Sequence, residues 1–100
     1  MGLSARHEFV GDVLCLTFSG QFDLGTIPVI GDAFAKALVE AGSTLLVDLH
    51  DIAVPDDNAL GILVASMTRA RESGRELVVT CPPGAVADQL ARFGVPLRQN

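Results

Sequence analysis

The sequence predicts an α/β domain with a mixed, mostly parallel sheet of four to five strands, an N-terminal hairpin and three helices. Short apolar runs alternate along the chain with longer stretches whose apolar residues recur at helical spacing. The first two strand-like runs are separated only by Gly11-Asp12, which is typical of a tight hairpin turn. Strands that alternate with helices imply right-handed crossovers and therefore parallel pairing in the rest of the sheet.

The N-terminal part predicts two strands followed by a helix. His7 to Val10 and Val13 to Phe18 have the composition of strands on either side of the turn. Thr26 to Ala41 predicts a helix, with Thr26 as its cap and Gly42 as its end. One stripe of this helix is expected to face the core, and it consists of Ile27, Ile30, Phe34, Leu38 and Ala41.

The C-terminal part predicts two to three further strands and two helices. Leu45 to Leu49 is a short continuous apolar run, typical of a strand covered on both faces. A helix is expected from about Asp57 to Glu72, a strand at Leu77 to Cys81 and a short helix at Pro83 to Arg92. An edge strand at Pro96 to Arg98 would be the fifth. The buried face of the longer helix should carry Leu60, Leu63, Val64, Met67 and Ala70.

Length and charge limit the classes of function. The 100 residues contain no linker or repeat, so we expect one domain over residues 1–100. The net charge is −5 with seven dispersed basic residues, which argues against binding to nucleic acid or to an anionic membrane surface. No apolar run approaches the ~20 residues of a membrane span, and the N-terminus has no signal-peptide segment. We therefore expect a cytoplasmic protein.

The chemically reactive residues do not form a recognisable catalytic or metal-binding pattern. Cys15 and Cys81 lie in apolar runs without CxxC spacing, so we expect buried reduced thiols. His7 and His50 have no partner spacing and are expected to be ordinary strand or loop residues. No glycine-rich phosphate-binding pattern and no nucleophile–base pair is present. The sequence therefore predicts neither a cofactor nor an enzyme.

Several stretches resemble the STAS domain, and within it the stand-alone anti-sigma factor antagonists of bacteria. Leu16 to Asp23, followed by Thr26, resembles the family's strand that ends in Gly-x-(Leu/Ile)-Asp before the first helix. Leu46 to Val54 is similar to its central strand and loop. Asp56 to Gly61 resembles its Asp-Ser-Ser-Gly-Leu-Gly stretch, and Ala70 to Leu77 is similar to the family's next segment. The resemblance covers nearly the whole chain and implies a STAS-like fold.

The resemblance also implies a mechanism in transcription regulation. The dephosphorylated protein binds an anti-sigma factor, often itself a serine kinase, and so frees a sigma factor, while phosphorylation of the first Ser after the motif Asp blocks this binding. Asp56 matches the motif Asp, Asp57 the phosphoacceptor, Asn58 the second Ser and Ala59 the Gly. Residue 57 has no hydroxyl, so it is non-phosphorylatable by a serine kinase. The implied partner surface consists of Asp23, Thr26, Asp56, Asp57, Asn58 and Leu60.

Asp57 and Asp23 each leave two interpretations open. Asp57 at a helix start is favoured as a cap by ~1 kcal/mol and interacts favourably with the helix dipole. In the second interpretation its negative charge imitates a phosphoserine. The imitation is imperfect, because phosphoserine carries a charge of about −1.5 to −2 and three acceptor oxygens. Asp23 is either a partner contact or a loop carboxylate that prepares the helix at Thr26.

Other functions are less well supported by the residues. The runner-up is a stand-alone STAS subunit of a membrane lipid-transport ABC system, which would bind an ATPase subunit through a similar surface. A response-regulator receiver is disfavoured, because no acidic pair follows the first strand and the single lysine, Lys36, lies in a predicted helix. A small-molecule-binding or enzymatic α/β domain is a distant alternative. The sequence predicts no particular oligomeric state.

Overall fold

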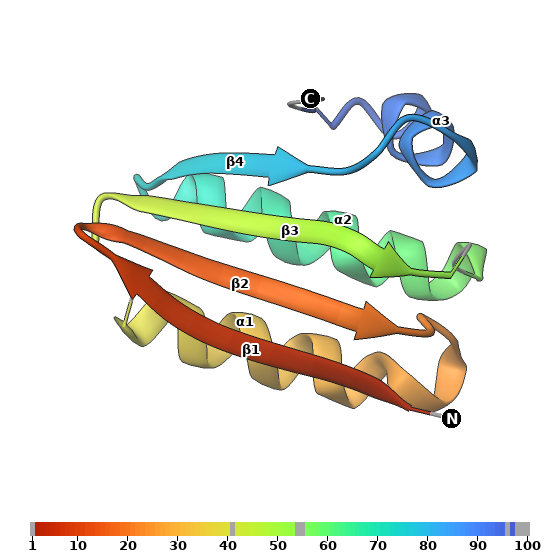
Figure 1. Cartoon of the computed structure of the whole chain (residues 1–100), viewed down its shortest axis with the longest axis horizontal. Helices are drawn as coiled ribbons and strands as arrows, with labels where there is room; N and C mark the ends of the chain where they lie inside the picture. Colours follow the sequence, from red (N-terminus) through yellow and green to blue (C-terminus); the bar gives the residue numbers. More distant parts are fainter. Residues whose placement is uncertain (1, 41, 54–55, 96, 98–100) are drawn as a thin grey trace.

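The computed structural model describes residues 2–40, 42–53, 56–95 and 97, which form one four-stranded sheet and three α-helices (Figure 1). The spatial order of the strands is β1-β2-β3-β4. β1 pairs antiparallel with β2, and the other two pairings are parallel, as the alternation of strands and helices predicts. The elements in chain order are β1 (Leu3–Val10), β2 (Val13–Gly20), η1 (Leu24–Thr26), α1 (Ile27–Glu40), β3 (Thr44–Ile52), α2 (Asp57–Glu72), β4 (Glu76–Thr80) and α3 (Ala85–Arg92).

The N-terminal hairpin turns at Gly11-Asp12, as predicted. Gly11 has φ +62°, a conformation that a glycine adopts without steric cost, and Val10 pairs with Val13 across the turn. β1 begins at Leu3, four residues before the predicted start at His7. The earlier residues include Ala5, whose short side chain gives only a weak alternating pattern, so the sequence signal for this strand is poor.

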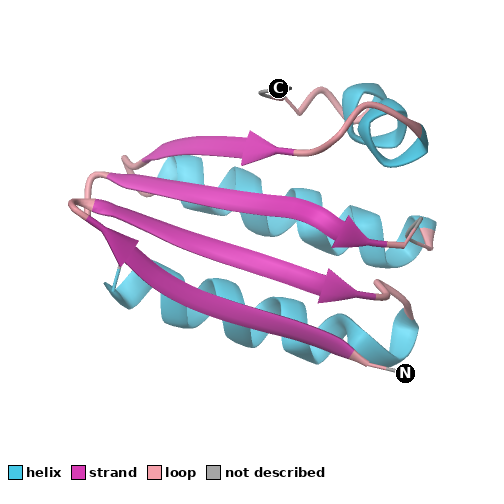
Figure 2. Cartoon of the chain, in the orientation of Figure 1, coloured by secondary structure: helices cyan, strands magenta, loops and turns pink. Residues whose placement is uncertain are grey.

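Both long helices lie on the same face of the sheet (Figure 2). Leu45, Val47 and Leu49 of β3 point toward the helices and are buried, whereas Leu46 and Asp48 on the opposite face are only half-buried. The prediction that this strand is covered on both faces is therefore wrong. No helix in the described part of the chain covers the face that carries Leu46 and Asp48. The apolar run therefore alternates between buried residues on the helix side and half-buried residues on the other side.

The core lies between the sheet and α1 and α2. Phe18 of β2 is fully buried, and its ring centroid lies 5.3 Å from that of Phe22 and 5.9 Å from that of Phe34. The predicted buried residues of α2 are confirmed except for Val64, which is half-buried. In α1 the structure buries Ile30, Ala33, Phe34 and Ala37, while Ile27 and Leu38 are half-buried and residue 41 lies outside the described part of the chain.

The ends of the helices differ in part from the prediction. α2 spans Asp57–Glu72 as predicted. α1 is preceded by the 3₁₀ turn η1, whose cap is Asp23, so Thr26 is not the helix cap. α3 begins at Ala85 rather than Pro83, after Gly84 with φ +143°. The proposed edge strand at 96–98 falls on residues that, apart from 97, lie outside the described part of the chain.

A carboxylate clip joins the hairpin turn to the loop before β3. Asp12 Oδ2 accepts hydrogen bonds from the Ser43 backbone N–H at 3.2 Å and from the Ser43 hydroxyl at 2.5 Å. The Ser43 hydroxyl, followed by the Ser43 backbone N–H, lowers the pKa of Asp12 below its usual 3.8. These bonds stabilise the ionised form, so the clip contributes stability above the unfolded-state pKa and loses it as the pH falls through the lowered folded-state pKa.

We therefore expect Asp12→Asn to change the pH dependence of stability. The native chain should lose more stability than the variant when the pH falls from 7 to about 2, because only the native chain must protonate the clip. Urea midpoints at the two pH values measure this difference. Asp51→Asn, at an exposed position on β3, is the control, and a native–variant difference no larger than the control's would contradict the role of the clip.

Candidate functional site

Three connections converge at the carboxyl ends of the parallel strands β2, β3 and β4 (Figure 1). They lead into η1, α2 and α3, respectively. The loop after β2 is joined to the start of α2 by a hydrogen bond from the Asp56 backbone N–H to the Phe22 carbonyl oxygen, at 3.0 Å. The sequence stretches around Asp23 and Asp57, distant along the chain, are thus brought together at this end of the sheet, as the resemblance implies.

Gly20 allows the loop after β2 to leave the sheet. Its φ of +116° lies in the region that disfavours side chains, and a Cβ placed on it would lie 2.2 Å from the Gly2 carbonyl oxygen. The Gly20 carbonyl oxygen accepts a hydrogen bond from the Ala53 backbone N–H at 2.9 Å. The glycine of the motif is therefore a backbone requirement that fixes the spacing between the loops after β2 and β3.

Asp23 and Thr26 form a capping box at the start of η1. The Asp23 carboxylate accepts from the Thr26 backbone N–H at 3.1 Å, and the Thr26 hydroxyl oxygen accepts from the Asp23 backbone N–H at 2.9 Å. Thr26 is 6% exposed, so it holds the loop from inside. The interpretation of Asp23 as a loop carboxylate that prepares the helix is confirmed, and Asp23 itself is half-buried at the site.

The cap of α2 is Asp56. Its carboxylate accepts a hydrogen bond from the Asn58 backbone N–H at 2.8 Å, and its carbonyl oxygen accepts from the Leu60 backbone N–H at 2.9 Å. The interpretation of Asp57 as the helix cap is therefore wrong by one position. The sequence motif does not show which of the two adjacent aspartates is the cap, because aspartate is favoured at both positions of a helix start.

Asp57 is the first residue of α2, and its carboxylate is exposed. It makes no hydrogen bond or ion pair with any residue in the described part of the chain. It retains the favourable interaction of an acidic residue with the positive end of the helix dipole. Asn58 beside it is also exposed, whereas Ala59 and Leu60 are fully buried, so Leu60 supports the site from the core and offers no contact surface.

A cavity of about 310 Å³ lies between the start of α2 and α3. It is lined by Asp57, Gln89, Arg92 and Phe93. Phe93 is 48% exposed, so an aromatic ring is available at the rim of the site. These three residues of the α3 region were not predicted. The only sequence signal for them was an apolar residue placed directly after the predicted end of that helix.

The separate roles of the two carboxylates lead to different stability predictions. Asp56→Ala should lower the free energy of unfolding by about 1 kcal/mol, because it removes the cap. Asp57→Ala should lower it by only about 0.3 kcal/mol, because only the dipole interaction of an exposed charge is lost. Urea denaturation of both variants measures the difference. A larger effect at Asp57 than at Asp56 would contradict this assignment.

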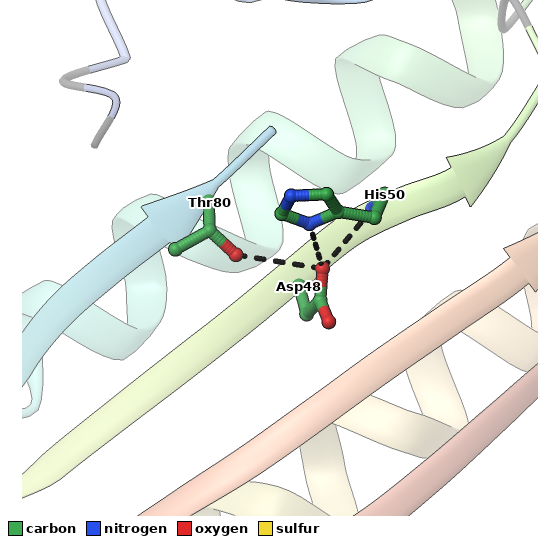
Figure 3. A network of polar contacts seen from close by, with 3 residues as sticks. All are labelled: Asp48, His50 and Thr80. Carbon is green, nitrogen blue, oxygen red and sulfur yellow. Dashed lines mark hydrogen bonds and ion pairs between the residues drawn. The ribbon is translucent and has the colours of Figure 1, made fainter. Parts of the chain in front are cut away.

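A second polar cluster lies on the face of the sheet opposite the helices (Figure 3). Asp48 Oδ1 accepts from His50 Nδ1–H at 2.5 Å, from the His50 backbone N–H at 3.1 Å and from the Thr80 hydroxyl at 3.4 Å. The His50 side chain is 50% exposed, so this pair is well solvated. In the part of the chain that the structure describes, no group of three or more His, Cys, Asp or Glu residues is arranged to hold a metal ion.

The two cysteines lie in different environments. Cys81 is buried, as predicted, and burial, followed by the charge of Asp48, raises the pKa of its thiol. Its thiol therefore stays protonated at neutral pH. Cys15 is only half-buried, because it lies on the face of the sheet away from the helices, so the prediction of burial is wrong for this residue.

Comparison with known proteins identifies similar chains. The family model described as "Mlab, STAS domain" matches residues 5–96. An anti-sigma factor antagonist from Mycobacterium paratuberculosis is similar in structure with a TM-score of 0.80 and 20% identity, over 95% of this chain and 84% of that chain. No helix among the described residues is long and apolar enough to cross a membrane.

The Bacillus protein SpoIIAA is similar in two states. Its unphosphorylated form matches with a TM-score of 0.75 and 14% identity, over 97% of this chain and 88% of that chain. Its phosphorylated form matches with a TM-score of 0.69 and 13% identity, over 97% and 91%. The similarity to all these structures therefore lies in the fold, with few identical residues.

Proposed function

Because the chain belongs to the STAS domain family, we propose that it acts by protein–protein binding, as an anti-sigma factor antagonist-like regulator that phosphorylation at residue 57 cannot switch. The observation that carries this proposal is the exposed carboxylate of Asp57 at the start of α2. The fold is that of anti-sigma factor antagonists, and the chain is proposed to be one STAS-like domain over residues 1–100.

We propose that the Asp57 carboxylate imitates the phosphorylated state in part. Asp56 already supplies the cap, so the fold does not require the Asp57 side chain as a hydrogen-bond acceptor. SpoIIAA has been solved in phosphorylated and unphosphorylated forms, so at least one protein of this fold gains negative charge by phosphorylation. A carboxylate carries one charge and two oxygens, fewer than a phosphoserine, so the imitation should weaken partner binding rather than abolish it.

The proposed partner surface consists of side chains that the structure leaves accessible at this end of the sheet. Asp23 is half-buried, and Asp56, Asp57 and Asn58 are exposed. Phe93, which lines the same cavity as Asp57, adds an exposed aromatic side chain. Aromatic side chains with polar neighbours are common centres of protein interfaces. The partner is proposed to be an anti-sigma factor with serine kinase activity, and the complex is proposed to be cytoplasmic.

The test compares partner binding by the native chain with binding by Asp57→Ser and Asp57→Ala. The partner is the serine kinase anti-sigma factor whose gene lies nearest to the gene for this chain. Isothermal titration calorimetry measures the dissociation constant. We expect both variants to bind at least about tenfold more tightly than the native chain, because they remove a charge that binding would bury unfavourably. Glu72→Ala, which removes an exposed carboxylate at the other end of α2 from Asp57, should leave the affinity unchanged.

The outcomes separate the parts of the proposal. Equal affinity of the native chain and both variants would contradict mimicry while supporting the partner. Absence of binding by all of them would contradict the anti-sigma factor function. With ATP and the kinase, Asp57→Ser should gain a phosphate that the native chain does not gain at this position.

A second candidate is a stand-alone STAS subunit of a membrane lipid-transport ABC system. Two observations favour it: the matching family model bears the name Mlab, and residue 57 lacks a hydroxyl, as suits a subunit that stays bound without a phosphorylation switch. Co-purification of the native chain with an ABC ATPase subunit, unaffected by Asp57→Ala, would support this candidate over the first.

A further inference from the structure

The outer edge of β1 is open. β1 is an end strand of eight residues, and no strand in the described part of the chain pairs with its outer side. It contains no proline, which is the residue that most simply blocks such an edge. A hollow of about 290 Å³ lined by Arg6, His7 and Glu8 lies along it. This edge therefore offers a row of backbone hydrogen-bonding groups for another strand.

The hairpin determines which backbone groups point outward. Val10 pairs with Val13 across the two-residue turn. A turn of this length is closed by a hydrogen-bonded pair, so hydrogen-bonded pairs are expected at every second residue of β1. The even-numbered residues of β1 therefore bond to β2. The odd-numbered residues Leu3, Ala5, His7 and Phe9 direct their backbone N–H and C=O groups to the open edge.

This pattern allows few symmetric pairings with a second copy. In a two-fold antiparallel arrangement, outward-bonding residues must face each other, which places the axis at Arg6, His7 or Glu8 near the middle of the strand. An axis at Arg6 or at Glu8 brings two like charges face to face. An axis at His7 places Arg6 of each copy opposite Glu8 of the other, in the non-hydrogen-bonded pairs where side chains are closest.

Arg6 and Glu8 are available for such pairs. Both are exposed on the face of the sheet away from the helices, and neither makes an ion pair with a described residue of its own chain. Their own cross-strand neighbours are the uncharged Thr17 and Cys15. On the helix side, Phe9 is 52% exposed and would lie opposite the small Ala5 of the second copy.

The α1 side of the edge has the same complementarity. His7 Nε2–H donates to the Ala33 carbonyl oxygen at 3.2 Å, so this part of α1 lies level with the proposed axis. A groove of about 290 Å³ runs between β1 and α1 and is lined in part by Asp32 and Lys36. Asp32 precedes Ala33 and Lys36 follows it along the helix, so an antiparallel second copy presents these α1 charges in the opposite order.

We propose that the outer edge of β1 binds the same edge of a second copy, in antiparallel register centred on His7, so that the two sheets join into one of eight strands. The occupant is a second copy rather than another protein because Arg6 and Glu8 complement themselves under one two-fold axis, and the order of Asp32 and Lys36 along α1 agrees with that axis. This edge lies across the sheet from β4 and away from α2, so the dimer leaves the Asp57 site accessible (Figure 1).

Charge reversal tests the proposal in the full chain. Sedimentation equilibrium should show a dimer population that rises with protein concentration. Arg6→Glu and Glu8→Arg alone should each raise the dimer dissociation constant about tenfold, because each replaces two attractive pairs by two repulsive ones. The double variant Arg6→Glu/Glu8→Arg should restore the native constant. Arg71→Glu, an exposed reversal at the end of α2, should change it by much less.

The outcomes of these measurements test both the dimer and its register. A monomer at all concentrations up to the millimolar range would overturn the proposal, as would single reversals that weaken the dimer no more than Arg71→Glu does. A dimer that the single reversals weaken but the double variant does not restore would overturn the register centred on His7. Circular dichroism of every variant confirms that the fold is intact before association is compared.

Discussion

Replacing Phe18 with alanine is expected to lower the free energy of unfolding by about 3–5 kcal/mol, since it leaves a cavity that the surrounding core fills only in part. Phe18 is fully buried in β2. Its ring lies 5.3 Å from that of Phe22, in the loop that leads to the site, and 5.9 Å from that of Phe34 in α1. The substitution therefore removes contacts that join the sheet, the loop and the helix.

Urea denaturation followed by far-ultraviolet circular dichroism measures this loss. Phe18→Leu keeps most of the apolar volume and should lose less than half as much stability. Val39→Ala is the surface control, because Val39 is 85% exposed, and its effect should stay within about 0.5 kcal/mol. A loss of less than about 1 kcal/mol for Phe18→Ala would contradict the central role of this ring.

Gly20→Ala is expected to lower the free energy of unfolding by about 3 kcal/mol. A side chain at φ +116° is strained by about 1–3 kcal/mol, and the added Cβ would also lie 2.2 Å from the Gly2 carbonyl oxygen. That oxygen belongs to the backbone, so it does not move aside by a change of rotamer. The first strand or the loop after Gly20 must shift, which also disturbs the Gly20–Ala53 hydrogen bond beside the site.

Gly31→Ala in α1 is the matched control for this prediction. A Cβ at Gly31 would meet nothing within 4 Å, and the residue is exposed within a helix. This variant should gain about 0.5–1 kcal/mol, since alanine is the better helix former. Chemical denaturation of both variants under the same conditions gives the comparison. If Gly20→Ala were as stable as Gly31→Ala, the close approach of Gly2 to Gly20 would be wrong.

The order and type of the elements could be predicted from the sequence because local signals were strong. The Gly11-Asp12 turn predicted the hairpin, and the helical spacing predicted the bounds of α2, and the structure confirms both. The single-sided sheet could not be predicted, because Leu45 to Leu49 has apolar residues on both faces and only the positions of the helices decide which face is covered. The early start of β1 was missed because alternation around Ala5 is weak.

The candidate site was predictable in its place and less so in its details. The motifs brought Asp23 and Asp57 to the same end of the sheet, as the structure has them. The division of roles between Asp56 and Asp57 depends on a backbone dihedral and one hydrogen bond, which composition does not encode. Arg92 and Phe93 were missed because they line a cavity with Asp57 only through the position that the tertiary fold gives to α3.

The one-residue separation between Asp56 and Asp57 has an evolutionary consequence. Asp56 caps the helix, because its carboxylate accepts a hydrogen bond from the Asn58 N–H. Asp57, the position that matches the phosphoacceptor, makes no hydrogen bond or ion pair with a described residue, so the two roles are independent. Mutation can therefore exchange a hydroxyl, a carboxylate or a neutral side chain at position 57 with little loss of folding stability. Under the proposed function, single substitutions at position 57 therefore add, fix or remove phosphorylation control while the fold is kept.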